Sequence, residues 1–221
     1  MSIQDVPIPE RMARLERDKR GYPIPVNVYR DATGRPHFTV NDEDIRQRHI
    51  AEDRCPICGG VLLRGRWFVG GPLSGLRDDG SYIDPPMHRE CAVYALQVCP
   101  YLAAPNYSDE KRIDGATLPS DDPNAILMDQ TIIPERPEVF VAVMSIGQRI
   151  SWALLPNGRR WAQYVRPVRP VRRVEFWRHG MLLTAREGVE LAARARLPEG
   201  YDQSKPPRLL LRPGRAPPLG R

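Results

Sequence analysis

Short runs of alternating apolar and polar residues dominate the second half of the chain and predict β-strands. Such runs occupy 138–145, 148–155 and 159–165, and Pro-Asn-Gly, a tight-turn sequence, separates the last two. A fourth run, at 174–180, is followed by Thr-Ala-Arg-Glu at 184–187, which has the form of a helix capping box. We therefore predict an antiparallel meander, a fourth strand and then a helix.

The N-terminal part combines an extended arm with short elements. Two prolines in Pro-Ile-Pro-Val disfavour helix and favour an extended chain. The runs 26–30 and 37–40 are strand-like and flank the turn-forming residues 31–34, so we expect a hairpin. Asn41 then suits the N-cap of a short helix that leads to Cys55.

The composition between these two parts predicts a domain boundary. Residues 105–137 are polar and Pro-rich and favour a connection. We expect an N-terminal domain at 1–104, with arm, hairpin and metal module, and a domain of antiparallel strands plus a helix at 138–203. The tail 204–221 contains five basic residues, five prolines and no acids, and predicts disorder.

No segment of the 221 residues predicts a membrane span or a secretion signal. Runs of about 18 apolar residues do not occur, and the N-terminus lacks the apolar centre of a signal peptide. We therefore expect a cytoplasmic protein without a membrane partner. In a reducing compartment, four cysteines indicate metal binding or free thiols rather than disulfides.

The net charge of +6 is unevenly distributed. Residues 1–130 carry 16 Lys and Arg against 20 Asp and Glu, whereas residues 131–221 carry 17 against 7. The basic C-terminal part favours an acidic partner, either nucleic acid or an acidic protein. Codon bias in a GC-rich genome is an alternative explanation, because only three of the 33 basic residues are Lys.

The most concentrated basic sequence is Arg-Pro-Val-Arg-Pro-Val-Arg-Arg at 166–173. Its prolines favour a sheet edge or an extended linker. The candidate contacts for nucleic acid or another acidic partner are Arg166, Arg169, Arg172 and Arg173. A solvated loop is the competing interpretation, and the sequence favours it over a phosphate-binding groove.

Two short motifs together predict one structural zinc ion. Cys55-Pro-Ile-Cys58-Gly59 has the form of a zinc knuckle, in which two thiolates converge and the glycine permits a tight turn. His88 and Cys91 stand three residues apart, so the first turn of a helix would point both the same way. The sum is Cys3His, a closed set typical of structural sites. Four unrelated buried side chains are the less favoured alternative.

The order of these elements resembles a treble-clef finger. Residues 61–71 between the two motifs predict a hairpin with Arg-Gly at its turn, and Pro85-Pro86 suits the start of a helix. The expected fold class is therefore α+β: a treble-clef zinc module followed by a small antiparallel sheet with a C-terminal helix. Cys99, followed by Pro100, is predicted to be a buried free thiol at the helix end.

Catalytic zinc is the less favoured interpretation of the same residues. His88-Arg-Glu90 copies the H-x-E sequence of zinc deaminases, but there H-x-E precedes the cysteine pair. Here Cys91 can also fill the coordination position that a catalytic zinc leaves open. A treble clef serves HNH nucleases as well, but residues 59–87 lack the histidines that those enzymes need in the hairpin.

Several of these motifs together resemble a known family. PERMARLERDKRGYPIPVNV, CPICG, WFVGGP, PPMHRECAVYALQVCPYL and WRHGMLLTAREGVELA are similar to uncharacterised proteins encoded by actinobacteria and their phages. The resemblance covers most of 9–104 and, more loosely, 140–200. It supports the Cys3His site and implies a high-GC bacterial, phage or prophage context. It implies no activity.

Two functional hypotheses follow. The favoured one is a non-enzymatic, zinc-binding protein whose basic C-terminal half contacts nucleic acid or an acidic protein. The alternative is an enzyme acting on a nucleotide or nucleic acid in a pocket between the two halves. Its candidate acids are Asp78, Asp79, Asp84 and Glu90, although a solvated turn is the favoured explanation for the three aspartates in 77–84.

Overall fold

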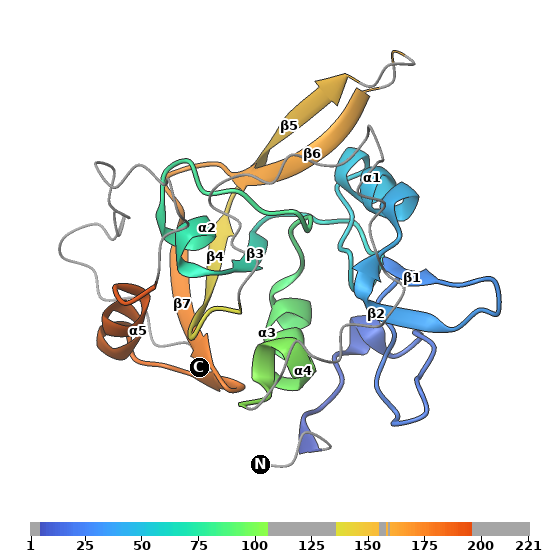
Figure 1. Ribbon diagram of the computed structural model, residues 1–221, viewed down its shortest axis with the longest axis horizontal. Coiled ribbons are helices and arrows are strands. Elements are labelled where there is room, and N and C mark those ends of the chain that lie inside the picture. The colour runs from blue at the N-terminus through green and yellow to red at the C-terminus, as the bar shows by residue number, and fades with distance from the viewer. Residues whose placement is uncertain (1–4, 106–135, 155–157, 159, 196–221) are drawn as a thin grey trace.

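The protein is a mixed α+β structure with antiparallel sheets, seen in a computed structural model (Figure 1). The structure describes residues 5–105, 136–154, 158 and 160–195. The strands are β1 (Val28–Arg30), β2 (Pro36–Asn41), β3 (Arg66–Gly70), β4 (Phe140–Ser145), β5 (Gln148–Leu154), β6 (Arg160–Pro167), β7 (Arg173–Arg178) and β8 (Met181–Leu182). The helices are η2 (Glu10–Met12), α1 (Glu43–Ala51), α2 (Pro72–Leu76), α3 (Arg89–Val98), α4 (Pro100–Ala103) and α5 (Ala185–Ala192).

The central sheet has the strand order β3-β4-β7-β8, and all its pairs are antiparallel. Strand β3 comes from the N-terminal part, yet it pairs along its whole length with β4, for example Phe68 with Val143. One sheet thus joins both sides of the expected boundary at 105–137, and the two parts share a core. The predicted meander is wrong, because β4 pairs with β3 and β7 rather than with β5.

Alternate residues of the central strands build two separate apolar clusters. The metal face of the sheet consists of Trp67, Val69, Phe140, Ala142, Glu175 and Trp177, most of which pack in the cluster that contains the three cysteines of the knuckle and α3. The opposite face consists of Phe68, Val141, Val143, Val174 and Phe176. Helix α3 lies on the metal side, whereas α2 and α5 lie on the other (Figure 1).

Strands β5 and β6 form a two-stranded hairpin of their own that extends from the body of the molecule (Figure 1). Ala162 and Val165 are buried and join the opposite-face cluster. The backbone of β6 is also bonded on its outer edge, since Tyr82 and Val165 exchange two hydrogen bonds of 2.9 Å. The base of the hairpin is therefore fixed, while its tip points away.

Helix α1 holds that edge of β6 with two buried side chains. The guanidinium of Arg46 is fully buried and donates to the carbonyls of Ile83 (2.7 Å), Ala162 (3.0 Å) and Gln163 (2.7 Å). Gln47 donates to the Ala162 carbonyl and accepts from its N–H. Arg46 can be buried here because each of its three guanidinium nitrogens donates a hydrogen bond to a backbone carbonyl.

The local predictions in the N-terminal part are largely confirmed. The predicted hairpin is β1–β2, and Gly34 closes its turn with a positive φ of 81°. The predicted N-cap was off by one residue: Asp42, not Asn41, accepts from the Ile45 N–H. Asn41 instead ends β2 and bonds the side chains of Asn27 and Asp84.

Near the other end of the chain, the predicted capping box is present. Thr184 accepts from the Glu187 N–H, and the Glu187 carboxylate accepts from the Thr184 N–H, at the start of α5. Most of 105–137, the tail 204–221 and all of the Pro-Asn-Gly turn except Gly158 lie outside the described residues. None of the helices that the structure describes is long and apolar enough to cross a membrane.

Candidate metal centre

The Cys55–Cys58 segment folds as a tight knuckle. The Cys55 carbonyl accepts from the Gly59 N–H at 2.8 Å, and the Gly60 carbonyl accepts from the Cys55 N–H at 2.9 Å. Gly59 has a φ of +71°, a conformation that residues with a Cβ adopt with strain. The loop therefore turns both thiols to the same side, as the C-x-x-C spacing predicts.

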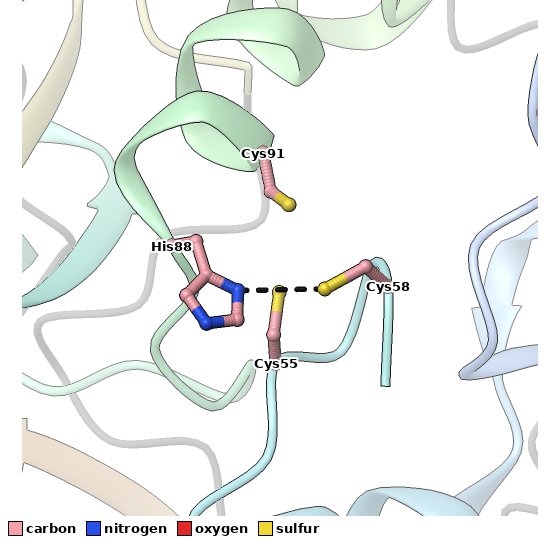
Figure 2. A group of neighbouring side chains, drawn as sticks. All are labelled: Cys55, Cys58, His88 and Cys91. Carbon is pink, nitrogen blue, oxygen red and sulfur yellow. Dashed lines mark hydrogen bonds between the residues drawn. The ribbon is translucent and has the colours of Figure 1, made fainter. Parts of the chain in front are cut away.

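The second pair of donors comes from the start of α3. His88 is the N-cap of this helix and Cys91 lies in its first turn. Figure 2 shows the four side chains of Cys55, Cys58, His88 and Cys91 converging on one point between the knuckle and the helix. Their ligand atoms all lie within 4.8 Å of one another.

These donors fit a single tetrahedral ion. Ligand atoms about 2.3 Å from zinc at tetrahedral angles lie roughly 3.8 Å apart. The Cys58 Sγ and His88 Nδ1 atoms are 3.4 Å apart, and the remaining separations are within 4.8 Å. Three sulfurs and one imidazole are a soft donor set that suits zinc. The cluster can therefore hold one metal ion, consistent with zinc.

The orientation of His88 is set by its second ring nitrogen. His88 Nε2 lies 3.1 Å from the Val61 carbonyl, which can only accept a hydrogen bond. The proton therefore resides on Nε2, and the lone pair of Nδ1 faces the thiols. Gly60 supports this arrangement, because a Cβ there would lie 3.4 Å from both Cys58 Sγ and the His88 ring.

Burial and mutual hydrogen bonds tune the three thiols. Hydrogen bonds from Cys55 and Cys91 lower the pKa of Cys58. Burial raises the pKa of Cys55 to about 11, and the hydrogen bond with Cys55 raises the pKa of Cys91. All three side chains are buried. A metal ion would displace the thiol protons, since the thiolate is the ligand form.

Helix α3 is anchored to the metal face of the sheet next to His88. Arg89 pairs with the buried carboxylate of Glu175 at 3.2 Å and lies over the Trp67 ring at 5.6 Å. Arg173 pairs with the same carboxylate at 2.8 Å. The two guanidinium groups compensate the negative charge of the buried Glu175 carboxylate. Because Arg89 belongs to α3 and Glu175 to β7, this ion pair fixes the helix that presents His88 and Cys91 on the sheet.

The segment between the two motifs does not form the hairpin predicted at 61–71. Only β3 is a strand there, and its Trp67 exchanges hydrogen bonds with Met87, just before His88. β3 prefers the longer partner β4, whose apolar residues complete both clusters. Cys99 lies half-buried between α3 and α4, outside the group of four donors.

The acids proposed for an enzymatic site do not converge. All four acids are exposed: Asp78, Asp79, Asp84 and Glu90. Asp79 pairs with Arg77, Asp84 accepts a hydrogen bond from Asn41, and Glu90 pairs with Arg11, so three of the four have separate partners. Within the described part of the chain, the Cys3His set is the only group of three or more His, Cys, Asp and Glu placed to hold a metal ion. These acids therefore form no common centre.

Glu90, the acid of the H-x-E sequence, pairs with Arg11 on the surface. Burial would raise its pKa, but a backbone hydrogen bond and the hydrogen bond and ion pair with Arg11 outweigh it and keep the pKa below its usual value.

The four predicted contact arginines are not one open patch. Arg166 donates to Ser81 at 2.8 Å, Arg169 donates to the Gly75 carbonyl at 3.0 Å, and Arg173 pairs with Glu175. All three are half-buried, and only Arg172 is exposed. Three of the four thus have structural contacts, Arg166 and Arg169 near the base of the hairpin and Arg173 on the central sheet.

Sequence reasoning missed a second basic group, on the β5–β6 hairpin. Arg149 and Arg160 are exposed, and Arg160 lies 4.4 Å from the ring centre of Trp152. No ion pair among the described residues involves Arg149, Arg160 or Arg172. The signal in the sequence is that 139–174 contains seven Arg and neither Asp nor Glu.

Comparison with protein-family models, curated proteins and solved structures finds no match for this chain. The interpretation of the site therefore rests on its own geometry and chemistry.

Proposed function

We propose that this is a zinc-stabilised, non-enzymatic protein that binds nucleic acid through its arginine-rich β5–β6 region. One observation carries the proposal: the hairpin extends from the body of the molecule and displays the exposed Arg149 and Arg160, within a segment, 139–174, that contains neither Asp nor Glu. Exposed arginines that form no ion pair within the described part of the chain, such as Arg149 and Arg160, attract phosphate by charge.

The metal supports this proposal in a structural role. Three thiolates and one imidazole close the coordination of zinc and leave no position for water or substrate. A treble clef would also need a hairpin between the two ligand pairs, which residues 61–71 do not form. We nevertheless assign the zinc the structural role that it has in such modules, because the knuckle and the first turn of α3 supply the ligands in the same order. The ion would then fix α3 on the metal face and thereby the sheet from which the hairpin projects.

The enzyme hypothesis receives less support, because the candidate acids lie apart and Glu90 is held by Arg11. An acidic protein partner shares the charge argument with nucleic acid. The aromatic residues among the arginines favour nucleic acid, because nucleobases offer flat surfaces to stack on and acidic side chains do not.

The test is direct binding to nucleic acid as a function of salt. Fluorescence anisotropy with labelled DNA and RNA should show affinity whose logarithm falls linearly with the logarithm of salt concentration. Polyglutamate at the same charge concentration is the matched competitor. Equal displacement by polyglutamate would point to an acidic protein instead, and the absence of nucleic-acid binding at low ionic strength would overturn the proposal.

A further inference from the structure

The two faces of the β5–β6 hairpin differ in burial. Paired residues of an antiparallel ladder share a face, and the pairing of Ile150 with Val165 directs this pair into the opposite-face cluster. Arg149 pairs with Arg166, and Ser151 pairs with Tyr164, so these four side chains share the outer face. The outer face therefore combines arginine with an aromatic ring.

The outer face carries a like-charge pair. Arg149 and Arg166 stand directly opposite each other, an arrangement that is destabilising between neighbouring strands. The guanidinium of Arg166 also lies 4.9 Å from the ring centre of Tyr164. Arg166 is already held by Ser81, and it adds to the hydrogen bond from Arg77 in lowering the pKa of Asp79. The exposed Arg149 is therefore the member of this pair that is placed to meet a phosphate, with the Tyr164 ring on the same face.

The tip of the hairpin repeats this combination on its other face. The Trp152 side chain is 41% exposed and stacks with Arg160, which pairs with Leu154 across the ladder. An indole left open to solvent at a projecting tip contributes little to the core. Stacked arginine and tryptophan planes are the groups on which unpaired bases stack.

We infer that the β5–β6 hairpin binds single-stranded nucleic acid, with bases stacked on Trp152 and Tyr164 and phosphates neutralised by Arg149 and Arg160. This inference rests on the proposed function and specifies its ligand. A duplex is less suited, because its bases are already stacked on each other and only their edges and the phosphates are accessible.

The first experiment separates stacking from charge. Trp152→Ala should weaken binding of a labelled oligothymidylate about 16 nucleotides long by roughly 10-fold, and Trp152→Phe should retain most of the affinity. Leu154→Ala is the matched control: Leu154 is 73% exposed on the same tip but has no aromatic face. Tyr164→Ala and Tyr164→Phe form the same comparison on the outer face.

A second experiment counts phosphate contacts. Arg149→Gln and Arg160→Gln should each reduce the slope of log affinity against log salt by about 0.7, the value for one phosphate of a single strand. Arg186→Gln, on the 89% exposed Arg186 of α5, removes the same charge elsewhere and should leave the slope unchanged. Oligouridylate in parallel distinguishes RNA from DNA.

The outcomes distinguish this inference from the proposed function. If wild-type protein binds nucleic acid but the Trp152 and Tyr164 variants bind equally well, the hairpin assignment fails while the proposed function stands. A preference for duplex over single strands of the same length would also overturn the inference. If no nucleic acid binds at all, both fail. Weakening by Trp152→Ala but not by Leu154→Ala, with unchanged thermal melting, supports it.

Discussion

The two faces of the central sheet are built from alternate residues of the same strands but are stabilised by different chemistry. The metal face packs against α3 through Trp67 and the Glu175 ion pairs, beside the Cys3His group. The opposite face packs against α2, α5 and the hairpin through aliphatic and aromatic side chains. The metal face therefore adds a few specific ligands and ion pairs to its apolar packing, whereas the opposite face relies mainly on apolar packing.

The two faces should therefore respond differently to substitutions. Loss of one metal ligand should lower the free energy of unfolding strongly, because the remaining ligands bind the ion much more weakly and the binding free energy contributes to folding. Apolar packing loses stability in proportion to the volume or area disturbed. Both faces are built on the same three strands, and zinc content measures whether damage to the opposite face reaches the metal face.

The largest expected effect is on the metal face. Cys58→Ser should abolish binding of one equivalent of zinc and unfold the N-terminal part, since structural zinc contributes on the order of 10 kcal/mol in apparent terms. That figure is comparable to the whole stability of a domain, about 5–15 kcal/mol. Elemental mass spectrometry and a thermal melt with and without a strong chelator measure both quantities.

Cys99→Ser is the matched control for this substitution, because Cys99 is a cysteine outside the donor group. It should retain zinc and the melting temperature of the unchanged protein. Wild-type protein that loses zinc to the chelator without losing its fold would contradict the structural assignment.

A smaller but still large effect is expected where α1 meets the hairpin. Arg46→Met should lower the free energy of unfolding by at least about 2 kcal/mol, because the carbonyls of Ile83 and Gln163 lose this donor and each loss costs about 1–3 kcal/mol. The Ala162 carbonyl, by contrast, keeps its bond from Gln47. Urea unfolding measures the change. Arg48→Met, exposed on the same helix, should change stability by less than about 0.5 kcal/mol.

Next in size is a substitution that disturbs only the opposite face. A Cβ at Gly188 of α5 would lie 2.1 Å from the Phe176 ring, so Gly188→Ala should cost about 1–3 kcal/mol through overpacking. This cost exceeds the helix-propensity gain of about 1 kcal/mol. Zinc content should remain one equivalent in this variant, and a loss of zinc would show that the two faces are not independent.

The smallest expected effect is on the pH dependence of stability. Burial, with Arg48 and Arg54 adding repulsion, lowers the pKa of His49 in α1. The unfolded chain therefore binds a proton more readily, and the free energy of unfolding decreases as the pH falls below about 6.5. His49 contributes fully above that pH and progressively less as the pH approaches its lower folded pKa.

His49→Gln should flatten this profile between about pH 7.5 and about 5.5 in urea unfolding. Titration of the metal ligands is common to both proteins and cancels in the difference between them. Parallel profiles for the two proteins would show that His49 has no part in the pH dependence.

The sequence predicts the metal group well because its information is local. Cys55 and Cys58 lie in one turn, and His88 and Cys91 lie in one turn of helix, so spacing alone brings each pair together. The β1–β2 hairpin and the capping box at Thr184 are predicted for the same reason. In each case the residues that decide the geometry are close together along the chain.

Long-range partners could not be predicted in this way. Periodicity identifies β3 and β4 as strands but contains no information on which edges pair. Arg46 has the sequence context of an exposed helical arginine, and only the approach of β6 makes it buried. The sequence predicts the contact arginines at 166–173 because four arginines lie close together there. The spacing of arginines along the chain does not determine which side chains reach solvent, and of these four only Arg172 is exposed.

The pairing of β3 with β4 also determines when the protein can complete its fold during synthesis. The segment 71–139 must leave the ribosome after β3 and before its partner, which takes on the order of ten seconds. Throughout that interval Trp67 and Phe68 belong to a nascent chain with an open strand edge. Early capture of zinc by the knuckle and α3 would cover the metal side of β3 while its partner strand is still being made.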